Sequence, residues 1–99
     1  RDSWKLCYKQ MVEYILSNDP DDVNIFLPDS INEIQMVFFK DQAHRLRFLE
    51  GEKNLEKADY IIYSFRNTVG NNYEVGGFEE IYAIWVDGFK IGTILQRVT

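Results

Sequence analysis

Apolar side chains recur along the first part of the chain with the spacing of an amphipathic helix. Between residues 3 and 16 they fall three, four and seven positions apart, with charged residues between them, so this segment is predicted to be helical. Asp2 or Ser3 can cap the first N–H groups. Asn18 is followed by Asp19 and Pro20, and proline drives the residue before it out of the helical region. We therefore expect the helix to end there.

Three later apolar runs predict short strands. Residues 23–27 are rich in β-branched and aromatic side chains and lie between acidic residues and Pro28, as is typical of a buried strand. Residues 45–49 alternate and are followed by Glu50 and Gly51, which indicates a second strand. Residues 60–65 form the strongest candidate for a strand that is buried on both faces.

The segment between the first two strands predicts a second helix. Ser30 and Glu33 have the spacing of a capping box, and apolar residues from Ile31 to Phe38 recur at helical spacing. The helix should run to about Lys40. Residues 31–40 are also apolar enough to form a strand, which would instead give an α+β fold with one helix packed on an antiparallel meander.

The C-terminal segment predicts a β-hairpin. Residues 80–86 and 89–98 flank Asp87-Gly88, a pair that tolerates the positive φ values of a two-residue type I′ turn. This turn would place three pairs of residues opposite each other: Val86 and Phe89, Ile84 and Ile91, and Tyr82 and Thr93.

The two faces of this hairpin are both largely apolar. The turn assigns residues to one face as Tyr82, Ile84, Val86, Phe89, Ile91 and Leu95, and to the other as Ile81, Ala83, Trp85, Lys90 and Ile94. We therefore expect both faces to be covered. Trp85 and Ile81 could lie under a helix or form a surface for a partner, and the pattern does not choose between these.

The order of elements predicts a small, three-layer-like α/β domain. Strands joined through helices pack in parallel with right-handed crossovers, so we expect about three parallel strands, two helices and the C-terminal antiparallel hairpin on the sheet edge. Residues 67–77 contain Gly70, Gly76 and Gly77 with two asparagines, and are predicted to be a mobile loop. These glycines lack the spacing and the following helix of a phosphate-binding loop.

Length and composition narrow the class of protein. The chain has 99 residues, 45% of them hydrophobic and 15% aromatic, which is typical of one globular domain, residues 1–99. Its 11 Lys and Arg against 16 Asp and Glu give a net charge of −5, which disfavours nucleic acid as a partner. The longest apolar run, Ile81–Val86, is far shorter than the roughly 20 residues of a membrane span.

Few residues suggest chemistry, and none forms a recognisable catalytic motif. The turn at Asp19-Pro20-Asp21-Asp22 could attract a hard cation, but it lacks the other ligands of a calcium loop and is better read as a solvated turn. Glu79 and Glu80 could act with Asp59 as acid and base, yet neighbours on a strand point to opposite faces. We therefore interpret them as surface carboxylates.

Three further residues could take part in nucleophilic catalysis: one histidine and two possible nucleophiles. His44 has Asp41 nearby in sequence, but only Ser64 and Cys7 could serve as its nucleophile, and neither lies in a known motif. Cys7 is the sole cysteine and cannot form an intrachain disulfide.

A basic stretch of the chain could bind a phosphate or a lipid headgroup. It comprises Lys40, Arg45, Arg47 and Lys53, of which Arg45 and Arg47 would share one face of a strand. A solvated strand face is the favoured interpretation, so we assign no catalytic, cofactor-binding or metal-binding residue from the pattern.

The order of segments nevertheless resembles a known family. The helix of residues 4–16, the strand at 22–28, Ala58-Asp59-Tyr60 leading into an apolar strand, and the hairpin at 82–95 together resemble the soluble C-terminal domain of GT-C membrane glycosyltransferases. These enzymes, among them mannosyltransferases, take a sugar from a polyprenyl- or dolichyl-phosphate carrier. The resemblance spans nearly the whole chain, but its individual motifs are short.

The resemblance implies a place in a larger enzyme. The chain would be an extracytoplasmic domain excised from a membrane protein, would carry no catalytic group, and would cap the active site or help to receive a glycan or protein acceptor. Its first partner would be the transmembrane portion of the same protein. The family's catalytic acidic residues lie in loops between membrane helices, and no residue here matches them. No cofactor is implied, and the binding residues stay unknown.

A second function fits the same composition. A free-standing acidic inhibitor, such as an immunity protein that masks a basic toxin, would have this length and this negative charge, and complementary charge would speed its association. The two proposals predict different folds. A parallel sheet with an edge hairpin favours the transferase domain, whereas an antiparallel meander with an acidic concave face favours the inhibitor.

Overall fold

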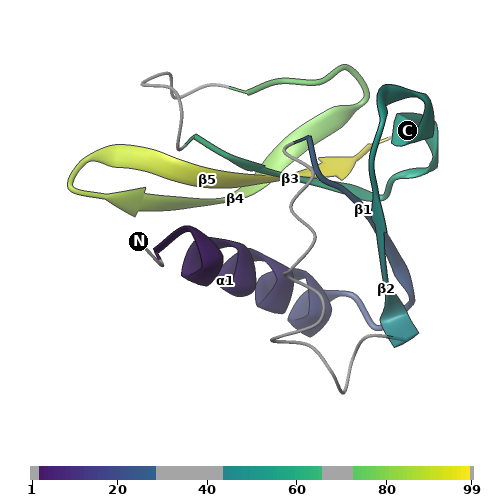
Figure 1. Cartoon of the computed structure of the whole chain (residues 1–99), viewed down its shortest axis with the longest axis horizontal. Helices are drawn as coiled ribbons and strands as arrows, with labels where there is room; N and C mark the ends of the chain where they lie inside the picture. Colours follow the sequence, from purple (N-terminus) through teal and green to yellow (C-terminus); the bar gives the residue numbers. More distant parts are fainter. Residues whose placement is uncertain (1–2, 29–43, 66–72, 99) are drawn as a thin grey trace.

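A single α-helix lies against one face of a five-stranded sheet in the computed structural model, which describes residues 3–28, 44–65 and 73–98 (Figure 1). The elements in chain order are α1 (Ser3–Asn18), β1 (Val23–Phe26), β2 (Leu46–Leu49), the 3-10 helix η2 (Glu52–Lys57), β3 (Tyr60–Ser64), β4 (Phe78–Val86) and β5 (Phe89–Arg97).

The sheet is mixed, with strand order β2-β1-β3-β5-β4. Strand β1 pairs in parallel with both β2 and β3, whereas β5 pairs antiparallel with β3 and β4. The small mixed α/β fold is thus confirmed, and its three parallel strands and edge hairpin agree in part with the predicted arrangement. The alternative of a purely antiparallel meander is wrong, because both pairings of β1 are parallel.

Part of the predicted architecture falls outside the described ranges. The second helix, expected from Ser30 to Lys40, lies there entirely, and so does most of the loop at 67–77. In the described part of that loop, Tyr73 stacks on Tyr63 with ring centroids 4.0 Å apart, and Val75 packs on a buried cluster. The third layer and the mobility of the loop stay predictions.

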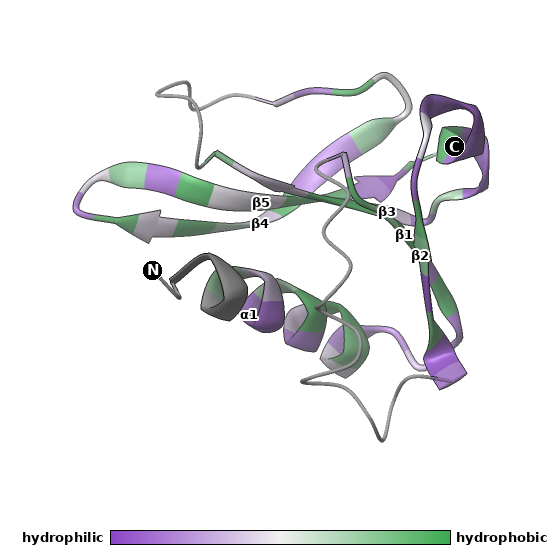
Figure 2. Cartoon of the chain, viewed as in Figure 1, coloured by the Kyte–Doolittle hydropathy of each residue, from purple (hydrophilic) through white to green (hydrophobic). Residues whose placement is uncertain are grey.

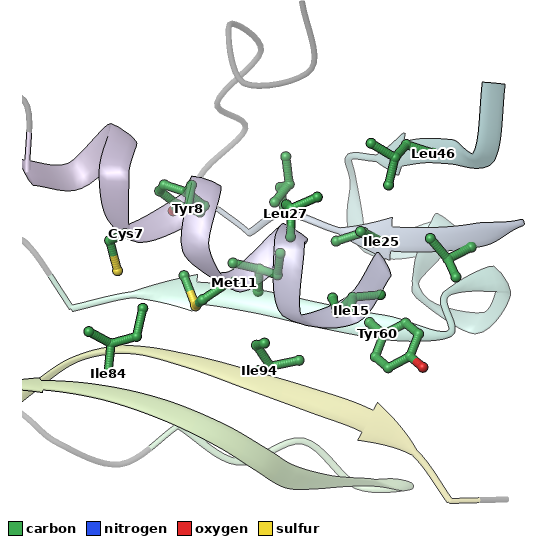
Figure 3. Close-up of a cluster of buried hydrophobic side chains, with 13 residues drawn as sticks. Cys7, Tyr8, Met11, Ile15, Ile25, Leu27, Leu46, Tyr60, Ile84 and Ile94 are labelled. Carbon is green, nitrogen blue, oxygen red and sulfur yellow. The ribbon is translucent and has the colours of Figure 1, made fainter. Parts of the chain in front are cut away.

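Helix α1 packs on the sheet through its apolar side. Cys7, Met11 and Ile15 lie one turn apart and are all buried, so their side chains point at the strands (Figure 3). On the solvent side, Lys9 and Glu13 form an i,i+4 ion pair at 2.6 Å. This division confirms the amphipathic helix expected from the spacing. Among the described residues, no helix has the length and apolar character to cross a bilayer.

Apolar side chains fill both faces of the central strands. The face under α1 forms the main core, which includes Val23, Ile25, Tyr60, Ile62 and Ile94. The opposite face, here called the open face, has a smaller cluster made of Phe26, Ala58, Ile61 and Leu95. Figure 2 shows many hydrophobic residues in the strands, whereas η2 is largely hydrophilic.

The hairpin turn has the predicted geometry. Asp87 and Gly88 have φ values of 53° and 84°, the left-handed pair that a type I′ turn requires. Val86 pairs with Phe89 as expected.

The register beyond the turn differs from the prediction. Ile84 pairs with Gly92 rather than Ile91, and Tyr82 pairs with Ile94 rather than Thr93, because the ladder shifts at two irregularities, between Glu80 and Tyr82 and between Ile84 and Trp85. Tyr82, Ile84 and Ile91 nevertheless pack on the same core, as predicted, and the assignment of faces is wrong for Ile94 and Leu95. Ile94 packs in the main core with Ile84, and Leu95 lies on the open face.

The shifted register has a steric cause at Gly92. A Cβ atom there would stand 2.6 Å from Sγ of Cys7 and 3.1 Å from Cε of Met11. Only a residue without a side chain fits directly beneath α1 at this point. An unshifted ladder would place Ile91 opposite Ile84, and the extra residue in β5 lets the glycine take that position instead.

The expectation that both hairpin faces are covered is wrong at the turn end. Trp85, Val86 and Phe89 expose 58%, 48% and 63% of their surface. Ile81, by contrast, packs against the main core. The hairpin is buried where α1 crosses it and projects beyond the helix at its tip.

Candidate functional site

The acidic turn after α1 lies at the start of the parallel strands. Asp22 immediately precedes β1, and Asp59 immediately precedes β3, so parallel pairing brings the two segments to the same sheet edge. Backbone N–H of Asn24 donates to Oδ2 of Asp59 at 2.9 Å. Four aspartates, Asp19, Asp21, Asp22 and Asp59, line a recess of about 320 Å³ together with Tyr60, Gln96 and Arg97.

Much of this acidic recess is engaged in holding the fold together. Tyr60 Oη donates to Oδ2 of Asp19 at 2.8 Å, and the Asp21 N–H donates to Oδ1 of the same carboxylate at 3.0 Å. Arg97 donates to the carbonyls of Ala58 and Leu55 at 2.7 and 2.8 Å. In the described ranges no group of three His, Cys, Asp or Glu side chains is arranged to hold a metal ion.

Tyr60 is a neutral donor in this recess. Burial raises the pKa of its phenol, and the hydrogen bond to Asp19 together with the charges of Asp19 and Asp59 raises it further, against an opposing hydrogen bond with Gln96, to about 12. A phenol held protonated ties the turn to β3. Pro20, Asp21 and Asp22 are exposed, as predicted for a solvated turn, and Asp19 is the residue that joins the turn to β3.

The basic stretch does not act as one anion site. Arg45 lies before β2 rather than within it, and its guanidinium donates to the carbonyl oxygens of Asp19 and Asp21. Arg47 is exposed on β2, and Lys53 is exposed on η2. The prediction that Arg45 and Arg47 share one strand face is wrong, because Arg45 turns toward the end of α1. Lys40 lies outside the described residues.

The histidine and the two candidate nucleophiles lie in different settings. Cys7 lies on the buried side of α1. Burial raises the pKa of its thiol to about 11, so the thiol stays protonated at neutral pH. His44 is exposed and adjoins Arg45, which reaches the C-terminal end of α1. Eleven helical rises, about 16 Å, separate Asn18 at that end from Cys7. Ser64 is buried at the end of β3. The structure therefore does not join His44 and Cys7 into a catalytic pair.

A second recess lies over the open face of the hairpin. It has a volume of about 520 Å³ and is lined by residues 73–80 with Lys90 and Leu95 of β5. At one wall, Lys90 Nζ contacts Oε2 of Glu80 at 2.7 Å, and Thr93 Oγ1 donates to the same oxygen. Glu79 is opposite Gln96 and Glu80 is opposite Leu95, so these carboxylates alternate between faces as predicted.

Glu80 is the ionised centre of this wall. Its partial burial raises the pKa of the carboxyl, but the hydrogen bonds from Lys90 and Thr93 and the charge of Lys90 outweigh burial and hold the pKa below its usual value. The Lys90 ammonium also lies 5.4 Å from the ring centroid of Trp85. The wall of the recess therefore presents a carboxylate and an ammonium in contact with each other.

The sequence pattern alone did not predict which residues lie together in the two recesses. Asp59 reaches the acidic turn only through the parallel register of β1 and β3, and the prediction of parallel strands was the one signal that could have found it. Glu80, Lys90 and Thr93 meet across the hairpin, whereas the predicted register put Lys90 on the face opposite that of Tyr82 and Leu95. Comparisons of the chain with protein-family models, with curated proteins and with solved structures found no match.

Proposed function

We propose that this chain is the extracytoplasmic C-terminal domain of a GT-C type membrane glycosyltransferase that uses a polyprenyl-phosphate sugar. In this proposal the catalytic groups belong to the transmembrane portion of the same protein. The domain covers the catalytic face of that portion and helps to receive the acceptor.

The sheet order is the observation that carries the proposal. The resemblance implies a helix, parallel strands and a final antiparallel hairpin, and the order β2-β1-β3-β5-β4 with two parallel pairings of β1 has this form. The competing inhibitor predicted an antiparallel meander. The topology supports the first proposal at the level of fold, and the function beyond it rests on the resemblance.

The recess over the open face is the natural place for an acceptor to be held. Its wall combines the ionised Glu80, the Lys90 ammonium and the ring of Tyr73. Carboxylates and ammonium groups hydrogen-bond to hydroxyl-rich molecules, and aromatic rings pack on their apolar faces. An acceptor glycan is therefore a suitable occupant for a recess of about 520 Å³.

The test begins with the complete gene product in its native membrane. We expect carbonate washing to leave the protein in the membrane, and a tag placed after Thr99 to be accessible to protease from outside the cell. Transfer of labelled sugar from a polyprenyl-phosphate donor should be lost when residues 1–99 are deleted.

A matched pair of variants separates acceptor binding from folding. Lys90→Ala should raise the KM for the acceptor, whereas Arg47→Ala, an exposed change on the far edge strand, should leave it unchanged. Release of the complete protein by carbonate would overturn the proposal. Undiminished sugar transfer without residues 1–99 would overturn it as well.

The acidic recess favours the inhibitor as a second candidate. Four aspartates from two distant segments line one surface, which is more acidic surface than the sequence order suggested. The inhibitor would be released by carbonate, and it would bind a basic nuclease with an association rate that falls steeply as salt is added. A salt-insensitive rate would exclude it.

A further inference from the structure

The tip of the β4–β5 hairpin is an apolar projection. Trp85 and Val86 end β4, Phe89 begins β5, and all three are exposed. The Lys90 ammonium lies over the ring of Trp85, 5.4 Å from its centroid. Exposed apolar groups that lie together on a soluble surface usually mark a contact site.

We propose that this hairpin tip rests in the headgroup region of a lipid bilayer. The proposal rests on the proposed function, because it takes the bilayer to be the membrane into which the rest of the transferase is inserted. It adds a second contact between the domain and the membrane surface, formed by Trp85, Val86 and Phe89.

The position of the tip supports this occupant. The N-terminal end of α1 and the hairpin turn lie at the same end of the molecule, and the C-terminus lies at the other (Figure 1). Near that end, Cys7 of α1 lies directly over β5, with its Sγ 4.0 Å from the carbonyl oxygen of Ile91. Under the proposed function the chain enters the membrane before α1. The end that carries the hairpin tip then faces the bilayer.

The chemistry of the tip matches the membrane interface rather than the hydrocarbon core. Tryptophan is enriched where an apolar ring meets a wet boundary. Asp87 forms the apex of the turn, and its carboxylate has to stay at headgroup level. The tip therefore contacts the bilayer at shallow depth, with its aromatic rings beside the headgroups.

A protein partner is a poorer fit to the same surface. An aromatic side chain carries roughly 150–250 Å², so the exposed parts of the three side chains offer on the order of 300 Å², against about 800 Å² per partner in a stable protein interface. The edge strand β4 also has one bulge, at Ile81, and a bulge opposes pairing with a second strand. A bilayer requires neither a large complementary surface nor a regular edge.

The charges of the tip and of the whole chain make the contact between the hairpin tip and the bilayer independent of anionic lipid. Asp87 and Lys90 carry opposite charges at the tip, and the chain as a whole carries −5. An acidic protein gains nothing from a negative surface, so zwitterionic lipid should suffice. Removal of the apex charge by Asp87→Asn should strengthen the contact severalfold, because Asn-Gly keeps the type I′ turn.

Photo-cross-linking in the complete gene product tests the proposal. A benzophenone amino acid is placed at position 89, and in a control at position 47, which is exposed on β2 at the opposite edge of the sheet. The protein is reconstituted in zwitterionic nanodiscs, irradiated, and analysed by mass spectrometry for lipid adducts. We expect severalfold more lipid adduct at position 89 than at position 47, and a further increase with Asp87→Asn.

Carbonate washing of the same protein separates the two proposals. If the protein stays in the membrane but position 89 gives only polypeptide adducts, or no more lipid adduct than position 47, the tip contact is overturned and the proposed function stands. If carbonate releases the protein, the proposed function fails, and lipid adducts at position 89 in added zwitterionic vesicles would support the tip contact by itself. Absence of those adducts would overturn both.

Discussion

At the scale of single residues, α1 packs closely on β5 at Gly92. A Cβ atom at this position would overlap Sγ of Cys7 and Cε of Met11. The helix can therefore approach β5 only because this position carries no side chain. The same contact accounts for the shifted register of the hairpin, so one residue links the helix, the strand and the face assignment of β5.

Gly92→Ala is expected to lower the free energy of unfolding by about 1–3 kcal/mol, the usual effect of overpacking a core. Urea denaturation of the chain measures this change. Gly76→Ala is the matched control, because nothing lies within 4 Å of its would-be Cβ, and it should be close to neutral. In a Cys7→Ala background the loss from Gly92→Ala should shrink, since the nearest atom is gone. Equal effects of the two glycine substitutions would contradict the packing argument.

A second residue-scale prediction concerns alkaline pH. The pKa of Cys7 is raised by burial from 9.0 to about 11, so the folded state holds the proton more tightly than the unfolded state. This contribution to stability is complete below pH 9 and is lost as the pH rises to 11. At 1.36 kcal/mol for each unit of pKa shift, the loss is about 2–3 kcal/mol.

The measurement is the free energy of unfolding between pH 8 and pH 11. Cys7→Ala should flatten the curve over this interval, whatever its effect on stability at pH 8. The raised pKa of Tyr60, about 12, adds a separate decline that begins near pH 10, and Tyr60→Phe should remove only that later part. A curve for Cys7→Ala parallel to that of the parent chain would contradict the assignment.

At the scale of elements, the hairpin turn is the feature most directly encoded by local sequence. Both turn residues have positive φ, and only glycine and a few polar residues adopt that region readily. Gly88→Ala should therefore destabilise the hairpin by about 1–2 kcal/mol, whereas Asp87→Asn should leave stability unchanged. Thermal unfolding of both variants measures the difference. A neutral Gly88→Ala would show that the turn geometry is wrong.

The limits of sequence-based reasoning also lie at this scale. The helix, the strands and the turn follow from local periodicity and turn chemistry, so their positions were predicted within a few residues. The extra residue in β5 adjoins Gly92, where α1 packs closely on the strand, and no local signal in the sequence marks that contact. Asp59 and Asp19 meet through the pairing of β1 with β3, and Lys90 meets Glu80 through the shifted ladder. Contacts of this kind depend on register rather than on residue type.

At the scale of the whole molecule, the described sheet is unevenly covered. Strand β3 lies between β1 and β5 and has buried residues on both faces. Strand β4 forms one edge, is mostly exposed or half-buried, and ends in the exposed tip. The described part of the molecule thus has a densely buried centre, and its projecting end is held mainly by hairpin pairing.

This asymmetry predicts a gradient of hydrogen exchange. Amides of β3 should exchange slowest, because they open only when the sheet separates, and amides of residues 84–90 should exchange fastest among the strands, since few buried contacts hold that end. Exchange measured by mass spectrometry in buffer, and again with the complete protein in nanodiscs, tests both the fold and the surface contact. Slower exchange at 84–90 alone in nanodiscs is expected if lipid covers the tip. Equal protection of β3 and of the tip in buffer would contradict the packing described for the sheet.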